Sequence, residues 1–483
     1  MPPTTSAPPR AELPPFAAQF VLPIAAAVAA GQLIAAFGSG YWFDEVYMLA
    51  IGRNHLDWGS ADQPPLTPLL AALMDTIAPG SVPVLRIPAI LATTAAVAVA
   101  ALIAREIGGD RRAQAITAGV QATALWITLA GHWLTPYTLE PVQWLVLLWL
   151  LVRWVRTRDD RSLLALGAVA GIAAETKFQV LLLCAVLLLS VLLVGPRELL
   201  ARPALWGGAA IGAGIAAPTL WWQAVHDWPQ LRMGGVVVAE ADALYGGRPG
   251  VATALIILAG IAGTALLAIG VWALLRDPRW RSYRFLIPTL LLLYALFVLA
   301  PGRPYYLGGF YAVVAAFGAV HLQQRRVAGS RRLSWVVWPA FALSAAAAVG
   351  MLTVPAAEQS AAMGEDVARN TANAYRSLPA EQQQRTAIIG GSYINAAYVD
   401  GYSTQLGLPE AHSTNRSYGY FDPPPPDADS ALYVGRDPAG LRPYFTGIRP
   451  VHRQDGPSDV WLLTGRTAPW EQIWAERRAL DVG

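Results

Sequence analysis

Acidic and amide side chains interrupt long apolar stretches in the first third of the sequence. Asp44 and Glu45 are adjacent, Asp62 and Gln63 precede two prolines, and Glu140 follows the segment Pro-Tyr-Thr-Leu. A carboxylate can act as a general base toward a hydroxyl group or as a ligand of a divalent cation. The paired prolines exclude a regular helix and fix a rigid turn that could hold Asp62 and Gln63 against Asp44. Structural roles stay open: a solvated loop for Asp44 and Glu45, a simple re-entry loop for Asp62 and Gln63, and a helix-terminal acid for Glu140.

Two cationic motifs complement these acids. Lys177 is the only lysine in the sequence and follows Glu175 and a threonine. A lysine at that place could neutralise a phosphate as a point charge, or it could pair with Glu175 or extend its ammonium to the membrane interface. Arg303 precedes Tyr305 and Tyr306. An arginine with two tyrosine hydroxyls makes a good anion cradle, although the same residues could anchor the chain at a membrane surface.

The composition assigns these motifs to a membrane protein. Of 483 residues, 55% are hydrophobic and only 14% are charged, and the mean hydropathy is +0.40. Soluble domains carry about 25% charged residues, so an ordinary soluble enzyme is excluded. The single cysteine, Cys184, cannot form a disulfide within the chain, and the small net charge of +3 gives no sign of nucleic-acid binding.

Apolar runs predict a mainly α-helical protein with about eleven transmembrane helices, since roughly 20 apolar residues span a bilayer. Residues 1–15 are predicted to be a disordered cytoplasmic tail, and residues 16–354 a transmembrane domain with an outer loop over 39–81. The predicted spans are 16–38, 82–104, 113–131, 136–152, 162–176, 178–195, 203–222, 250–275, 285–300, 305–322 and 334–354.

Arginine placement predicts the orientation of these spans. Alternate loops contain two to four arginines each, and these loops are residues 105–112, 153–161, 197–202, 276–284 and 325–332. Cytoplasmic loops carry the excess of positive charge. We therefore expect a multi-pass protein of the plasma membrane with a cytoplasmic N-terminus and with all the acidic and cationic motifs at the outer face.

Residues 355–483 have no spanning run and predict a small α/β domain outside the membrane. Residues 386–390, 431–434 and 460–463 read as strands, and residues 393–405 read as a helix after a glycine-serine turn.

The distribution of charge favours an enzyme over a transporter. Ionisable groups are nearly absent from the centres of the predicted spans and gather at their outer ends, whereas an ion-coupled transporter places them near the midplane. Two alternatives remain: a transporter or flippase for a lipid-linked sugar, and a membrane-anchored binding protein whose outer domain carries the function.

Taken in order, the Asp-Glu pair, the Asp-Gln-Pro-Pro-Leu segment and the Pro-Tyr-Tyr-Leu turn resemble glycosyltransferase family 39 of the GT-C superfamily. This group includes protein O-mannosyltransferases and the lipid A aminoarabinose transferase. The resemblance covers residues 15–325 well and extends loosely into the outer domain, at residues 390–395, 407–409 and 412–415.

The resemblance implies a GT-C fold and transfer of a sugar from a polyprenyl-phosphate donor to an acceptor hydroxyl of a protein, glycan or lipid. It implies that Asp44 is the catalytic base and that Lys177 faces the donor phosphate. We also predict that Glu45, the adjacent carboxylate, is a catalytic residue. Gln63 stands where the aminoarabinose branch has a lysine, so that contact loses its charge.

The implied substrate-binding residues are Asp62, Gln63, Glu140, Lys177, Arg303, Tyr305 and Tyr306. For cofactors two alternatives stay open: the carboxylates accept hydrogen bonds and hold none, or they bind a divalent cation such as Mg²⁺ or Mn²⁺.

Overall fold

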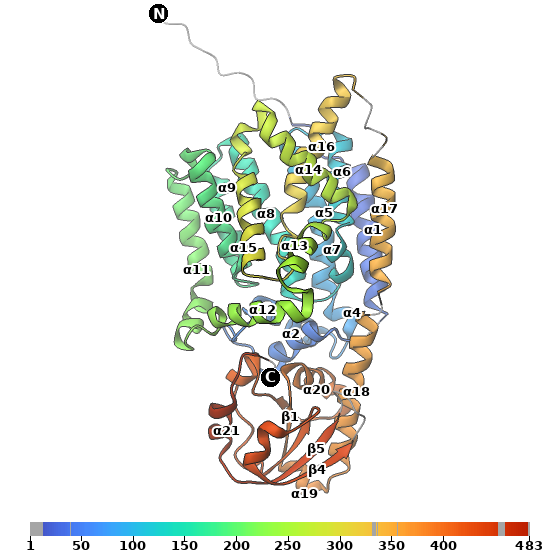
Figure 1. Ribbon diagram of the computed structural model, residues 1–483, viewed down its shortest axis with the longest axis vertical. Coiled ribbons are helices and arrows are strands. Elements are labelled where there is room, and N and C mark those ends of the chain that lie inside the picture. Colours follow the sequence, from blue (N-terminus) through green and yellow to red (C-terminus); the bar gives the residue numbers. More distant parts are fainter. Residues whose placement is uncertain are drawn as a thin grey trace, which may run out of the picture.

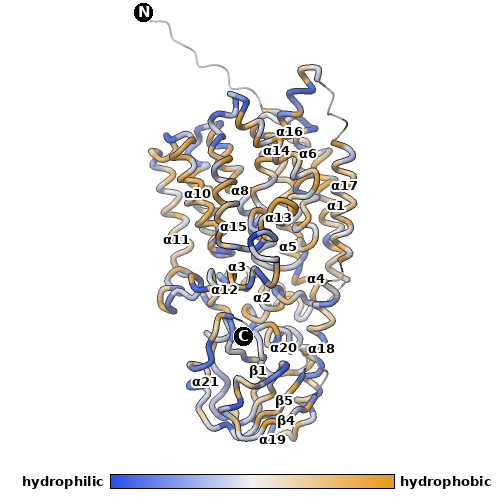
Figure 2. Tube along the Cα trace, in the orientation of Figure 1, coloured by the Kyte–Doolittle hydropathy of each residue, from blue (hydrophilic) through white to orange (hydrophobic). Residues whose placement is uncertain are grey.

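The structure is a computed structural model that describes residues 13–38, 40–330, 335, 337–354, 356–452 and 459–481. It is mainly helical: a bundle of apolar helices carries a small α/β domain at one end (Figure 1). Hydropathy follows this division. Apolar residues dominate the bundle, and polar residues lie in the domain and at both ends of the helices (Figure 2).

The bundle contains both long and short apolar helices. In chain order they are α1 (Ala18–Ala36), α4 (Val82–Leu85), α5 (Ile87–Glu106), α6 (Arg111–Ala122), α7 (Leu125–Ala130), α8 (Pro136–Thr157), α9 (Arg161–Ala174), α10 (Gln179–Val194), α11 (Pro203–Val225), α13 (Gly247–Ile257), α14 (Ile261–Arg276), α15 (Leu286–Leu299), α16 (Tyr311–Val327) and α17 (Val337–Leu352).

Among the described helices, four are long and apolar enough to cross a membrane: α1, the continuous α4–α5 segment, α8 and α11. The pair α13 and α14 would make a fifth if counted as one span. Several other apolar helices are shorter. The figure of eleven spans therefore stays a prediction.

Two of the predicted spans, 113–131 and 250–275, are broken helices. The first divides into α6 and α7, and the second into α13 and α14, which meet at an angle of 87°. The two breaks lie against each other, because the Leu125 amide donates to the Leu258 carbonyl at 3.0 Å. Gly260 has φ +78°, and a Cβ there would lie 2.7 Å from the Thr123 carbonyl oxygen, so glycine is required at this crossing.

Three further helices lie across the end of the bundle that faces the α/β domain. They are α2 (Phe43–Asn54), α3 (Leu66–Ile77) and α12 (Pro229–Tyr245) (Figure 1). The first two lie within the predicted outer loop over residues 39–81. Helix α12 was not predicted, and it begins after Asp227 and Trp228, which both have left-handed backbone conformations.

The arginine-rich loops meet at the other end of the bundle. Arg156 pairs with Glu106, and Arg158 with Glu198 at 2.5 Å. Arg279 donates to Gln324 at 2.6 Å. These contacts join loops that are distant in the sequence, so the predicted alternation of charge corresponds to one basic end of the molecule.

The C-terminal domain is a five-stranded sheet of order β2-β1-β3-β5-β4, with β2, β1 and β3 parallel and β5 and β4 antiparallel to their neighbours. Its elements are α18 (Ala356–Arg376), α19 (Ala380–Gln384), β1 (Thr386–Gly390), α20 (Tyr393–Leu406), β2 (Ala411–His412), η3 (Arg416–Tyr420), β3 (Ser430–Val434), η4 (Ala439–Tyr444), β4 (Phe445–His452), β5 (Val460–Arg466) and α21 (Trp470–Arg477).

The predicted strands and helix of this domain are all present. Ser392 caps α20 by accepting a hydrogen bond from the Asn395 amide, and Gly407 ends the helix with φ +62°. Strand β4 was not predicted, because Gly447 and Pro450 weaken the strand pattern. Its place at the edge of the sheet tolerates the proline.

The domain is docked directly on α2. The Arg53 guanidinium donates to the Asp400 carbonyl at 2.6 Å and is paired with Asp75 on α3 at 2.8 Å. Gly401 packs so closely that a Cβ would lie 2.2 Å from a methyl group of Val46. Helices α2 and α20 thereby share one apolar core, which fixes the domain against the end of the bundle.

Candidate active site

A cavity of about 520 Å³ lies where the helical bundle meets the C-terminal domain. Its size is typical of small-molecule sites. Of the predicted site residues, seven line it: Asp44, Asp62, Gln63, Lys177, Arg303, Tyr305 and Tyr306. Segments far apart in the sequence therefore supply one site.

Asp44 lies in the first turn of α2, where the helix dipole favours a negative charge. Its side chain faces the cavity and accepts a hydrogen bond from the Tyr137 hydroxyl. Burial raises the pKa of Asp44 to about 6, and the repulsion of Asp62 adds to the rise; Tyr137, Arg416 and Arg303 oppose it. A carboxylate with this pKa is suited to accept a proton near neutral pH.

Glu45, the neighbouring acid, occupies a different environment. It is fully buried and forms an ion pair with Arg86, which is also fully buried. Arg86 also donates to the Ala36 and Gly40 carbonyls, and Glu45 accepts from the Trp42 amide at 2.8 Å. The residues that line the cavity do not include Glu45, so its contacts indicate that it holds the start of α2 in place.

Asp62 is held by four groups. The Tyr47 hydroxyl donates to it at 2.7 Å, the Ser417 hydroxyl at 2.6 Å, and the Arg416 guanidinium lies 3.8 Å away. Gln63 donates to the other carboxylate oxygen at 3.2 Å. Two of these contacts come from the C-terminal domain, so Asp62 joins that domain to the bundle.

Lys177 stands over the rings of Tyr306 at 4.1 Å and Tyr305 at 5.4 Å, which is cation–π geometry. Its ion-pair partner is Glu140 at 3.6 Å, whereas Glu175 accepts from Thr219 at 2.6 Å. Glu140 does not line the cavity and reaches it only through Lys177. The pairing with Glu175 that the sequence left open is therefore wrong.

Arg303 points to the side of the cavity formed by α12. It is paired with Glu240 on that helix and lies over the Tyr245 ring at 5.7 Å. Glu240 also accepts from Arg416 at 2.6 Å. Together with Asp44, Asp62 and Lys177, these groups give the cavity three acids and three cations.

Residues of this site that were not predicted as site residues from the sequence include Tyr47, Glu240, Tyr245, Tyr393 and Arg416. Glu240 and Arg416 lie outside every recognised motif, and nothing local distinguishes them from surface charges. Two signals were available: Tyr393 lies within the matched stretch 390–395, and Arg416 directly follows the His-Ser-Thr-Asn stretch at 412–415.

The carboxylates of the cavity do not form a metal-ligand set. Asp44, Asp62 and Glu240 are engaged by separate hydroxyl and guanidinium groups. Among the residues that the structure describes, no group of three or more His, Cys, Asp or Glu side chains is arranged to hold a metal ion. We therefore derive no catalytic step through a divalent cation.

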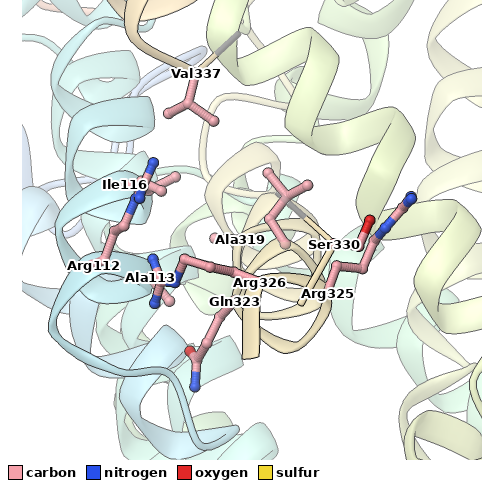
Figure 3. A pocket seen from close by; sticks show the side chains of 10 residues that line it. Arg112, Ala113, Ile116, Ala319, Gln323, Arg325, Arg326, Ser330 and Val337 are labelled. Carbon is pink, nitrogen blue, oxygen red and sulfur yellow. The ribbon is translucent and has the colours of Figure 1, made fainter. Parts of the chain in front are cut away.

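Two of the cavities away from this site lie in the helical bundle. One is a narrow pocket at the basic end of the bundle, with Arg112 and Arg326 on one side and Arg325 on the other (Figure 3). The second is an apolar cavity of about 260 Å³ between α8, α9, α10 and α11, and Ala174 on its wall is three residues before Lys177.

Part of the chain matches a known protein family. A family model described as dolichyl-phosphate-mannose-protein mannosyltransferase matches residues 62–222, a third of the chain. No curated protein matches the sequence. The matched segment includes Asp62, Gln63, Glu140 and Lys177.

Solved structures share the fold. ArnT from Cupriavidus metallidurans in the apo state has a TM-score of 0.64 and 15% identity, with 93% of this chain and 100% of that chain covered. ArnT bound to undecaprenyl phosphate gives a TM-score of 0.62 at 14% identity with the same coverage. The Archaeoglobus fulgidus oligosaccharyltransferase, in complex with Zn and sulfate, gives 0.51 at 15% identity, covering 79% of this chain and 61% of that chain.

These identities are low, so the structures show the fold alone, and the family model matches one third of the chain. The resemblance seen in the sequence is thereby confirmed: the chain shares its fold with ArnT and with the archaeal oligosaccharyltransferase, and residues 62–222 match the mannosyltransferase family model.

Proposed function

We propose that this chain is an integral membrane glycosyltransferase that moves a sugar from a polyprenyl-phosphate donor to an acceptor hydroxyl at the outer face of the membrane, with inversion. The observation that carries the proposal is that Asp44, Lys177 and Arg303 line one cavity. A base and two cations are the groups that such a transfer needs, and the glycosyltransferase kinship of residues 62–222 supports it.

In this mechanism Asp44 accepts the proton of the acceptor hydroxyl. The acceptor oxygen forms its bond to the anomeric carbon as the bond from that carbon to the phosphate oxygen breaks. Polyprenyl phosphate leaves with the bonding electrons, and Lys177 and Arg303 stabilise its developing negative charge. A single displacement of this kind inverts the anomeric centre, by analogy with inverting glycosidases.

Lys177 is supported for this role by its surroundings. It is 22% exposed, so its ammonium can reach a ligand in the cavity. The faces of Tyr305 and Tyr306 stabilise its positive charge, and Glu140 forms an ion pair with it. Gln63 stands where the aminoarabinose branch has a lysine. Lys177, the only lysine in the sequence, is therefore the only one available to the donor phosphate.

The lipid of the donor has a suitable place beside this site. The apolar cavity between α8 and α11 begins near Ala174, close in sequence to Lys177, and extends toward Leu199 and Leu205 at the other end of the bundle. A polyprenyl chain beyond its phosphate is entirely apolar, so burial there is favourable. ArnT, which shares the fold, was solved with undecaprenyl phosphate bound.

The arginine-rich loops at one end of the bundle support the proposal that the site lies at the outer face. Arginine-rich loops favour the cytoplasmic side. The C-terminal domain lies at the opposite end of the bundle (Figure 1), and the cavity lies where that domain meets the bundle. Nucleotide sugars are made in the cytoplasm, so a site at the outer face requires a donor that a lipid has carried across. We propose the plasma membrane as the location and a protein, glycan or lipid as the acceptor.

The proposal is tested with purified protein in detergent. Radiolabelled polyprenyl-phosphate mannose or arabinose is incubated with a membrane extract as acceptor pool, and the corresponding nucleotide sugars serve as controls. We expect transfer of label from a lipid-linked donor and none from the nucleotide sugars. Absence of transfer by folded protein, together with movement of the labelled lipid across liposome membranes, would instead support a flippase.

A further inference from the structure

A carboxylate bridges two arginines that come from different parts of the molecule. Arg303 belongs to the turn between α15 and α16, and Arg416 begins η3 of the C-terminal domain. Both are bound to Glu240 of α12: Arg303 holds one carboxylate oxygen and Arg416 the other, the latter at 2.6 Å. The two guanidinium groups are therefore spaced to donate hydrogen bonds to two oxygens of a single anion.

Both arginines keep donors for a further ligand. Within the part of the chain that the structure describes, Nη1 of Arg303 and Nε of Arg416 are buried and have no hydrogen-bond partner. The Arg416 side chain is only 9% exposed. A buried donor without a partner is unfavourable, and both side chains line the cavity. A ligand with more acceptor oxygens than a carboxylate would satisfy them.

The backbone of Arg416 is held in an uncommon conformation. Its φ is +52°, a left-handed value that favours glycine or asparagine. The last described residues of the chain maintain it, because the Arg416 amide donates to the Ala479 carbonyl at 2.9 Å and the Ala479 amide donates to the Thr414 carbonyl at 3.0 Å. Such local strain persists where the surrounding structure imposes it, and it is often found at functional sites.

The Glu240 side chain is more exposed than those of the two arginines, so it can leave the site more easily. Its side chain is 26% exposed, against 9% for Arg416 and 13% for Arg303. On α12, positions 238 and 239 are also poorly covered. Rotation of the Glu240 side chain toward solvent would expose both guanidinium groups to the cavity without moving either arginine.

We propose that Arg416 of the C-terminal domain binds the donor phosphate together with Arg303, and that Glu240 occupies this anion site until the donor replaces it. This inference rests on the proposed function and extends it, because it makes the C-terminal domain part of the donor site. The ligand is the phosphate group of a polyprenyl-phosphate sugar. An anionic group on the acceptor is the competing source of the same chemistry.

The test measures binding of undecaprenyl phosphate to the full chain in detergent, with the uncharged polyprenol as a reference. Arg416→Asn removes the cation and suits the left-handed backbone, so the variant should fold. We expect its Kd for undecaprenyl phosphate to rise about 10- to 100-fold, the range for loss of charge-assisted hydrogen bonds, with no change for polyprenol. Arg442→Asn, which removes an exposed arginine paired with Asp437, is the control and should bind as wild type does.

A second variant tests the role of Glu240. Glu240→Gln removes the competing charge, and we expect undecaprenyl phosphate to bind several-fold more tightly than to wild type. Weaker binding would show that Glu240 supports the arginines and would overturn its role as a replaceable anion.

The outcomes separate this inference from the proposed function. Equal binding of undecaprenyl phosphate by wild type and Arg416→Asn would overturn the inference and leave the function standing, and a raised KM for the acceptor alone would assign Arg416 to the acceptor instead. Failure of wild type itself to bind undecaprenyl phosphate would count against the proposed function.

Discussion

Asp44 and Glu45 illustrate what single residues contribute and why the sequence could not assign them separately. Both were predicted to be catalytic, because both follow the first apolar run. Successive residues of a helix point about 100° apart, so one side chain faces the cavity and the other faces Arg86 in the core. The roles of the two carboxylates therefore depend on which face of α2 is turned toward the cavity, and the sequence alone does not give this.

The rise of kcat/KM on the acidic side of its pH profile should reflect deprotonation of Asp44. Its pKa is raised to about 6, and a base acts only when deprotonated, so kcat/KM should rise with pH and level off above about 6. Arg416 and Arg303 lower this pKa, so Arg416→Asn should move the rise to higher pH. Initial rates of transfer between pH 4.5 and 8.5 measure both profiles, and a rise near pH 4 in wild type would contradict the assignment.

Glu45 and Arg86 should matter for stability. Removing one partner leaves an unpaired buried charge, so Glu45→Gln or Arg86→Ala should lower the free energy of unfolding by about 3–5 kcal/mol. Thermal unfolding of the purified protein measures the loss, and Asp44→Asn is the matched control with little change expected. A Glu45→Gln variant as stable as wild type but inactive would return Glu45 to the catalytic site.

Among the elements, hydrophobicity predicted most helices but not their interruptions. An apolar run marks where a helix lies, and the ranges for α1, α5 and α11 agree with the structure to within a few residues. The break between α13 and α14 depends on a contact with another broken helix, which no local pattern reveals. Helix α12 was missed because its glycines and acids give no apolar run, although its Glu240 and Tyr245 line the site.

Helices α9 and α11 should depend on the glycines at their crossing. A Cβ on Gly208 would lie 2.3 Å from the Leu163 carbonyl oxygen, whereas nothing lies within 4 Å of one on Gly214 of the same helix. Gly208→Ala should therefore lower the free energy of unfolding by about 1–3 kcal/mol, and Gly214→Ala should leave it unchanged or slightly raised. Thermal unfolding compares the two, and equal losses would contradict the packing described.

At the scale of the whole molecule, the arginine-rich loops lie at the end of the bundle opposite the C-terminal domain (Figure 1), and the cavity lies beside that domain. The sequence predicted this polarity, because arginine placement is read loop by loop without knowledge of packing. It did not predict that the domain completes the site, since Arg416 and Tyr393 reach the cavity only through the docking of α20 on α2.

The orientation should be visible by cysteine labelling in intact cells. In a Cys184→Ser background, Gln472→Cys places an exposed thiol on α21 of the C-terminal domain, and Ser330→Cys places one after α16 at the basic end. A membrane-impermeant maleimide should label the first in intact cells and the second only after permeabilisation. The reverse pattern would put the site in the cytoplasm and remove the need for a lipid-carried donor.

The central claim is that Asp44 is the general base for sugar transfer from a polyprenyl-phosphate donor. Its most direct test is release of polyprenyl phosphate from labelled donor in the presence of acceptor, compared between wild type and Asp44→Asn. We predict release by wild type and a loss of at least about 100-fold in the variant, the contribution of a general base, with undecaprenyl phosphate still bound by both. Equal release by the two proteins would remove Asp44 from catalysis and contradict the account.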